Sequence, residues 1–176
     1  MIVTIDEFKT YAGIDNDDDD EAIELILVGA IGWCESICSN RFERKECEEL
    51  FDGDSEELFL DNTLNIKDVI VEQYVDYDWE TLDESLFTVY ADQGLIKLRN
   101  AVYGELNYRV KYKAGFADDA PNDLRLIILK IVGKFWNKRK SDGVRNENLS
   151  DAGLTWEEYL NTEVVKVLNK YRKYNL

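Results

Sequence analysis

The sequence contains no histidine, one proline and three cysteines in 176 residues. Without histidine, the usual general base near neutral pH is absent, and with it Ser-His-Asp and Cys-His nucleophile systems. Cys34, Cys38 and Cys47 are odd in number and form no CxxC pair, so neither a disulfide framework nor a common zinc site fits. We therefore expect no enzyme, with no catalytic residues, no cofactor and no bound metal.

The sequence also lacks a long apolar run, and its N-terminus, MIVTIDEFKTY, lacks the basic start and apolar core of a signal peptide. We expect a protein of the cytoplasm with no membrane contact. With 45% hydrophobic residues, the chain can bury one core and is too short for two full domains. A single domain spanning residues 1–176 is the expectation.

Basic residues are few, and they are unevenly placed. Residues 1–120 hold 10 Lys and Arg against 30 Asp and Glu (−20), and residues 121–176 hold 11 against 7 (+4), which together give the net charge of −16. An acidic body repels phosphates and cannot form the basic surface that nucleic-acid affinity requires. Tight DNA binding is therefore not expected.

The strongest concentration of acid lies in residues 15–21, DNDDDDE, directly before an apolar segment. The run departs from the pattern of a calcium-binding loop at two positions: Asp20 is found where that loop has glycine, and Ile26 where it has glutamate. Acids are favoured in the first turn of a helix by its unpaired amides and its dipole. We therefore interpret the run as the start of a helix.

Four helices are predicted. Thr4 and Glu7 form a capping box for a short first helix, and Thr155 and Glu158 repeat that form before a short basic terminal helix. Apolar residues recur at helical spacing over residues 23–37 and, after Pro121, over residues 124–135. We expect these two stripes to pack against each other as the core of the fold.

Between the helices, the spacing of apolar residues changes from the helical pattern toward every second residue, as in a strand. Residues 105–113 alternate with Leu106, Tyr108, Val110 and Tyr112 on one face, and residues 86–100 resemble two strands around a turn at residues 92–94. The predicted fold class is α+β, mainly α: N-terminal helices and a long C-terminal helix pack together, with a small antiparallel β-meander inserted between them and a short terminal helix. The expected boundaries are 1–42 for the helical part, 43–115 for the β-meander subdomain, 121–140 for the long helix, and 141–176 for a mobile loop and the terminal helix.

The sequence resembles the head-tail connector proteins of tailed bacteriophages over nearly its whole length. The resemblance is carried by MIVTIDEFKTYAGIDNDDDDEAIELILVGA at the start, by VKYKAGFADDAPNDLRLIILKIVGKFW at the passage from strand to helix, and by VVKVLNKYRKYNL at the end. It implies a structural, non-enzymatic subunit of the virion head-tail interface, made in the host cytoplasm before assembly. It also implies a homo-oligomeric ring of about twelve copies that docks beneath the portal protein, meets a tail-completion or stopper protein, and lets DNA pass without sequence-specific binding.

Two other functions remain open. An acidic adaptor or DNA mimic that occupies a basic protein explains the charge equally well. An enzyme would have to use neighbouring carboxylates such as Glu48 and Glu49 or Glu56 and Glu57, yet such pairs arise by chance among 37 acids.

Residues 141–176 are the expected docking segment, because their helix is both basic and amphipathic. Aromatic and aliphatic residues that fill a partner's pockets tend to dominate binding. The predicted interface residues are Trp156, Tyr159, Leu160, Val164, Leu168 and Tyr171. The alternative is that the terminal helix folds back onto its own core and buries Val164, Val167 and Leu168 without any partner.

Overall fold

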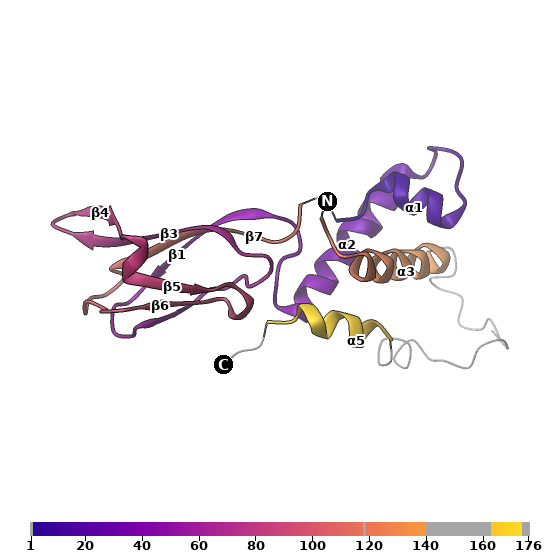
Figure 1. Ribbon diagram of the computed structural model, residues 1–176. Helices are drawn as coiled ribbons and strands as arrows, with labels where there is room; N and C mark the ends of the chain where they lie inside the picture. The colour runs from indigo at the N-terminus through magenta and orange to yellow at the C-terminus, as the bar shows by residue number, and fades with distance from the viewer. Residues whose placement is uncertain (1, 118, 140–162, 174–176) are drawn as a thin grey trace. The chain divides into compact units, whose positions relative to one another are not determined.

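The computed structural model describes residues 2–117, 119–139 and 163–173, and it divides the chain into two units (Figure 1). The helical unit is formed by residues 1–38 and 118–174, and the β-unit by residues 39–117. The described residues 2–38 come together with 119–139 and 163–173, although the β-unit separates them in the sequence.

The helical unit consists, in its described part, of three main helices and a short terminal one. Its first helix begins at the predicted capping box: the Glu7 amide donates to the Thr4 side chain at 3.2 Å, and the Thr4 amide donates to the Glu7 carboxylate at 2.9 Å. Gly13 ends it in the left-handed conformation, with φ of 68°. The helices are α1 (Ile5–Ala12), α2 (Asp20–Cys38), α3 (Asn122–Lys138) and α5 (Val165–Leu168), the last continued by the 3-10 turn η4 (Asn169–Tyr171).

The predicted packing of the two apolar stripes is confirmed, because α2 and α3 contact each other through buried residues. Phe8 of α1 adds an edge-on contact with Trp136 of α3, with ring centroids 6.1 Å apart. The buried residues of α2 and α3 are Ile23, Leu27, Ala30, Cys34 and Cys38, with Leu124, Ile127, Ile128, Ile131, Val132 and Trp136. None of the helices in the part of the chain that the structure describes is long and apolar enough to cross a membrane.

The β-unit holds two antiparallel sheets. The four-stranded sheet has the order β1-β7-β3-β4 and the three-stranded sheet the order β2-β6-β5. The strands are β1 (Lys45–Phe51), β2 (Glu57–Phe59), β3 (Lys67–Val75), β4 (Asp78–Thr81), β5 (Phe87–Tyr90), β6 (Leu95–Leu98) and β7 (Tyr108–Ala114).

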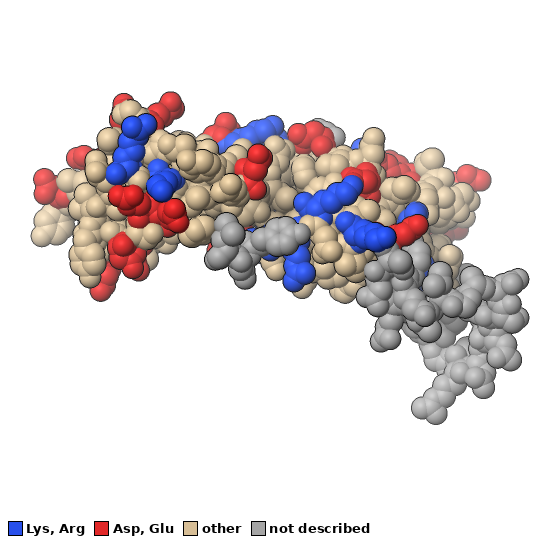
Figure 2. Space-filling view, turned by 60° about the horizontal axis from the view of Figure 1, so that its bottom comes forward, with Lys and Arg blue, Asp and Glu red and all other residues tan. Residues whose placement is uncertain are grey.

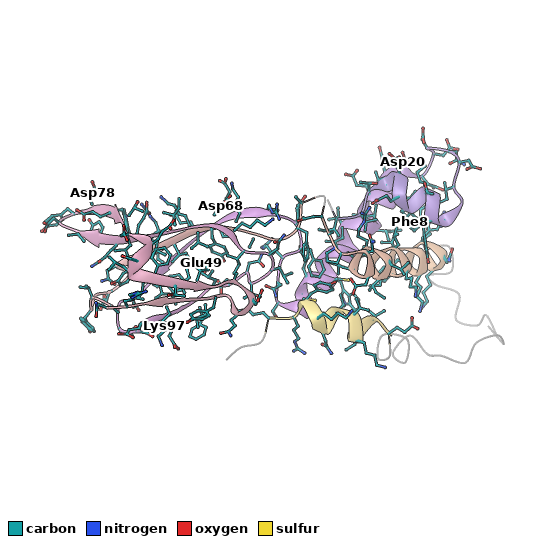
Figure 3. All side chains as sticks on the ribbon, viewed as in Figure 1. Phe8, Asp20, Glu49, Asp68, Asp78 and Lys97 are labelled. Atoms are coloured by element: carbon teal, nitrogen blue, oxygen red, sulfur yellow. The ribbon has the colours of Figure 1, made fainter. Side chains whose placement is uncertain are left out.

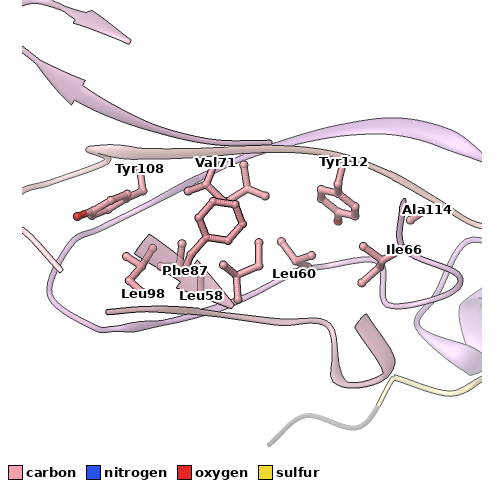
Figure 4. Packing of buried hydrophobic residues seen from close by; sticks show 11 residues of the cluster. Leu58, Leu60, Ile66, Val71, Phe87, Leu98, Tyr108, Tyr112 and Ala114 are labelled. Atoms are coloured by element: carbon pink, nitrogen blue, oxygen red, sulfur yellow. The ribbon is translucent and has the colours of Figure 1, made fainter. Parts of the chain in front are cut away.

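The apolar faces of the two sheets enclose the core of this unit (Figure 4). Along strand β7, side chains point alternately into the core and away from it. Tyr108, Val110 and Tyr112 are buried in the core, as predicted. Leu106, which was expected on the same face, precedes the strand and is exposed, with φ of 45°. The same alternation places Arg109, Lys111 and Lys113 on the opposite face.

The chain enters and leaves the β-unit through neighbouring backbone segments. The Phe116 amide donates to the Phe42 carbonyl at 2.6 Å, and the Arg44 amide donates to the Phe116 carbonyl at 2.8 Å. Gly115 has φ of 94°, and an added Cβ would lie 2.5 Å from the Glu43 carbonyl oxygen, so only glycine fits there. We call residues 42–44 with 115–116 the clasp of the β-unit.

The mainly α fold class was wrong. The described residues form a mixed α+β fold, with seven strands in two sheets in addition to the helices. The inserted β-part is not a meander, because β7 pairs with both β1 and β3, far from it in the sequence. The long helix spans Asn122–Lys138 instead of 121–140, and it is not C-terminal, because α5 and η4 follow it.

Candidate interaction surfaces

The terminal helix, which was the predicted docking element, contributes to the core of the helical unit. Val164 and Leu168 are fully buried, and Tyr171 is nearly so. The Cys38 thiol donates to the Leu168 carbonyl at 3.4 Å, and the Lys173 amide donates to the Cys38 carbonyl at 2.8 Å. These contacts attach the terminal segment to the end of α2.

A second attachment joins the terminal segment to the start of α3. The carboxylate of Asp123 accepts hydrogen bonds from the Tyr171 hydroxyl and from the Lys170 ammonium, the latter at 2.8 Å. The hydrogen bond from Lys170, followed by that from Tyr171, lowers the pKa of Asp123, while burial and the neighbouring carboxylate raise the pKa of Tyr171. Docking through Val164, Leu168 and Tyr171 stays a prediction, and these three side chains face their own core. Trp156, Tyr159 and Leu160 lie outside the described residues.

The acidic run forms a turn and the start of α2. The Lys9 ammonium, on a side chain that is almost entirely buried, donates to the carboxylates of Asp17 and of Asp20, the latter at 2.9 Å. These carboxylates raise the pKa of Lys9. Figure 3 shows Asp20 beside α1 at this end of the unit. Within residues 2–117, 119–139 and 163–173, no group of three or more acids and cysteines is placed to hold a metal ion.

Of the neighbouring carboxylates considered for an enzyme, Glu49 and Glu57 each contact residues of other strands or loops. Glu48 and Glu49 point to opposite faces of β1 because side chains alternate along a strand. Glu49 accepts hydrogen bonds from the Tyr112 hydroxyl and the Asp61 amide, so it ties β1 and β7 to the chain that follows β2. Burial, with the bond to Glu49, raises the pKa of Tyr112. Glu57 forms an ion pair with Lys97 across β2 and β6, at 3.5 Å.

The outer face of the four-stranded sheet is a layer of paired charges. Glu72 of β3 forms ion pairs with Arg109 and Lys111 of β7, the second at 3.1 Å, and Arg109 lies over the Trp79 ring, 4.4 Å from its centroid. The hydrogen bond from Arg109 lowers the pKa of Glu72. Figure 2 shows acidic and basic side chains interspersed on the face that it presents. On that face the two signs of charge lie side by side, although the whole chain carries a net charge of −16.

Sequence reasoning missed a set of exposed aromatic residues in two loops of the β-unit. Tyr77 is 93% exposed in the turn between β3 and β4, and Tyr103 is 85% exposed in the loop before β7. Asp76 and Tyr77 both have positive φ, 48° and 71°, as a two-residue hairpin turn of type I′ requires. The sequence VDYDW contains this turn without the usual Asn-Gly or Asp-Gly signal, which is why the pattern did not reveal it.

The loop that carries Tyr103 is held firmly. The Gly53 amide donates to the Gly104 carbonyl at 2.8 Å, the Leu106 amide donates to the Asp52 carboxylate at 2.6 Å, and the Asn107 side chain donates to the Val102 carbonyl at 2.7 Å. An exposed aromatic side chain on a fixed backbone binds at low entropic cost, as is typical of protein contact surfaces.

The described residues thus present exposed tyrosines and paired charges on the surface of the β-unit. A model of the head completion protein family matches residues 1–174, so the chain belongs to the head completion protein family. A search of curated proteins gave no match.

Solved structures of gene transfer agent (GTA) particles have a similar fold. The neck of an empty GTA particle, computed with C6 symmetry, matches with a TM-score of 0.65 and 13% identity over 99% of this chain and 91% of the other. The neck of a native GTA particle, computed with C12 symmetry, matches with a TM-score of 0.63 and 12% identity over 98% and 89%. The protein accordingly has a structural role at the head-tail connection and in virion assembly.

Proposed function

We propose that this protein is the ring-forming subunit of the head-tail connector, placed beneath the portal protein and around the channel through which DNA leaves the capsid. The observation that carries the proposal is the family match over residues 1–174, supported by a shared fold with necks of C6 and C12 symmetry. About twelve copies would form the ring. A tail-completion or stopper protein would bind below it, after the subunits have formed in the host cytoplasm.

The charge supports this role. A net charge of −16 disfavours phosphate binding, so a channel built from these subunits would let DNA slide without sequence-specific contacts. An acidic adaptor or DNA mimic would share that charge, but it would act as a small species bound to a basic protein. The family match favours the connector.

The decisive experiment is negative-stain electron microscopy of concentrated protein, alone and with the portal protein encoded in the same genome. Annular particles are expected, with light scattering giving a mass near twelve subunits. A species that stays monomeric in both samples would refute the ring, and tight binding to basic proteins by that monomer would establish the adaptor instead.

We also propose that the segment 141–176 docks to the portal or to the neighbouring subunit. Because Val164, Leu168 and Tyr171 are buried, a deletion of the segment would damage the core, and point substitutions test the proposal better. Trp156→Ala with Tyr159→Ala is expected to weaken portal binding at least tenfold while the melting temperature stays within a degree or two. Unchanged portal binding in a pull-down titration, together with unchanged self-association in sedimentation velocity, would remove these residues from the interface.

A further inference from the structure

Three loops of the β-unit meet at the end of the four-stranded sheet where β7 begins. The Tyr74 amide donates to the Asn107 carbonyl at 2.9 Å, which joins the β3–β4 hairpin to the loop before β7. Hydrogen bonds donated by the Gly53 amide and the Leu106 amide join the same loop to the turn after β1. We call residues 50–56, 74–79 and 99–107 the tip of the β-unit.

Apolar side chains gather on the tip and stay in solvent. Tyr77 and Tyr103 are 93% and 85% exposed, the two highest values among the large apolar side chains of the described residues. Single exposed apolar residues are normal on a protein surface, whereas a group of them marks a contact site. The group consists of Leu50, Tyr74, Tyr77, Val102, Tyr103 and Leu106, each at least 44% exposed.

The backbone presents two of these side chains at a conformational cost. Tyr77 has φ of 71° and Leu106 has φ of 45°, in the left-handed region that glycine and asparagine adopt more readily. Neither side chain is buried in return, since even Leu106 remains 56% exposed. Backbone strain of this kind is typical of binding sites. It therefore supports a contact with a molecule outside this fold.

The tip is acidic, which restricts what can cover it. Its residues include one base, Arg99, and six acids: Asp52, Asp54, Glu56, Asp76, Asp78 and Glu105. All six acids are exposed, and Figure 3 shows Asp78 at this end of the unit. Within the described ranges, none of the six takes part in an ion pair. A phosphate backbone, an anionic lipid surface or the tip of a second copy would be repelled there.

The basic side chains of the chain itself are poor counterparts for the tip, because many of them already pair with acids of the same chain. The lysines and arginines with ion pairs in the described residues are Lys9, Lys97, Arg109, Lys111, Lys113, Arg125, Lys130, Arg139 and Lys170. Lys134, Lys138 and Lys173 also have partners. A second copy therefore offers few cations that its own acids do not already hold, and a different protein fits the tip better.

We propose that the tip docks to a different protein of the virion, whose contact surface has apolar pockets bordered by arginine or lysine. Tyr77 and Tyr103 would fill these pockets, because aromatic side chains on a fixed backbone lose little entropy on binding. Asp76, Asp78 and Glu105 would meet the basic border and speed association.

The size of the contact is adequate for specific binding. Two tyrosines would supply about 300 to 400 Å² of the roughly 800 Å² that each partner of a stable pair buries. The inference rests on the structural role at the head-tail connection and not on the ring, because a single subunit already carries the complete tip.

Titration of the full chain by biolayer interferometry tests the two tyrosines. The probes are the purified portal protein and the purified tail-completion or stopper protein encoded in the same genome. At least one probe should bind the wild type, and Tyr77→Asn with Tyr103→Ser should weaken that binding at least tenfold, asparagine being compatible with the left-handed backbone at position 77. Tyr11→Ser with Tyr90→Ser removes two exposed tyrosines outside the tip and should bind like the wild type. Circular dichroism and the melting temperature verify that each variant is folded.

Charge neutralisation tests the basic border of the partner. Asp76→Asn with Asp78→Asn keeps the shape of both side chains, and asparagine can still accept the hydrogen bond from the Trp79 amide. The association rate should fall at least threefold at low salt and should depend less on salt than that of the wild type. Glu46→Gln with Asp92→Asn makes the same change of charge outside the tip and should associate at the wild-type rate.

Several outcomes would overturn the proposal. If neither probe binds the wild type, or if the tyrosine variant binds as tightly, the tip is not the docking site. If the tyrosine variant lowers self-association in sedimentation velocity instead, a second copy covers the tip. An association rate that is unchanged or raised by charge neutralisation would show that the partner is not basic. The ring proposal is judged by annular particles of the wild type, so either proposal can fail without the other.

Discussion

Ile128→Ala tests the central packing of the helical unit. Ile128 is fully buried on the face of α3 that contacts α2. The substitution removes three carbon atoms, worth about 0.8 kcal/mol each in lost burial, or about 2.4 kcal/mol. The cavity that remains adds to this cost, so we expect the free energy of unfolding to fall by about 3 to 4 kcal/mol, within the usual range for such changes.

Urea denaturation followed by far-UV circular dichroism measures this loss, at a protein concentration too low for self-association. Leu126→Ala is the matched control, because Leu126 lies two residues away on the same helix and is exposed. It should cost less than about 1 kcal/mol. A loss below about 0.5 kcal/mol for Ile128→Ala, or equal losses for the two variants, would show that the α2 and α3 packing is wrong.

Three further predictions concern the acidic run, a glycine and a carboxylate. Isothermal titration with millimolar calcium should show no saturable binding, because Lys9 already engages Asp17 and Asp20; one-to-one binding would contradict this. Gly53→Ala should destabilise the β-unit by about 2 kcal/mol or more, because the added Cβ would lie 1.9 Å from the Val102 carbonyl oxygen. Gly29→Ala, where an added Cβ meets no other atom, should be neutral or stabilising. Equal melting temperatures of the two variants would refute this difference. The pKa of Asp123 is lower in the folded state than in the unfolded state. Its stabilising contribution is therefore present above its unfolded pKa, about 4, and is lost as the pH falls through the folded pKa. The melting temperature of Asp123→Asn should accordingly depend less on acid pH than that of the wild type.

The helices were largely predictable because their signals are local. The Thr4 and Glu7 capping box, the acidic start of α2 and the stripe from Leu124 to Ile131 each depend on spacings of three or four residues. Strands β5 and β6 were equally predictable, since Gly94 takes the left-handed conformation that ends their connecting turn.

The sheet order could not be predicted, because β7 pairs with strands far away in the sequence, Ala114 with Lys45 for example, and no local pattern encodes such pairing. The exposed tyrosines were missed for a different reason. Tyr77 and Tyr103 occur in a sequence with many aromatic residues, and only the backbone of their loops shows that they point to solvent. The terminal helix was ambiguous, since the apolar stripe of Val164 and Leu168 is the same for a core and for an interface.

The clasp at residues 42–44 and 115–116 makes the β-unit a segment that can be replaced as a whole. Its two ends are joined by backbone hydrogen bonds, so the segment between them closes on itself before the chain returns to the helices. Insertions of this kind are tolerated when the inserted termini lie close together. Recombination between phages could therefore replace the β-unit while the paired helices keep their own core, and an engineer could substitute a reporter domain at the same two points.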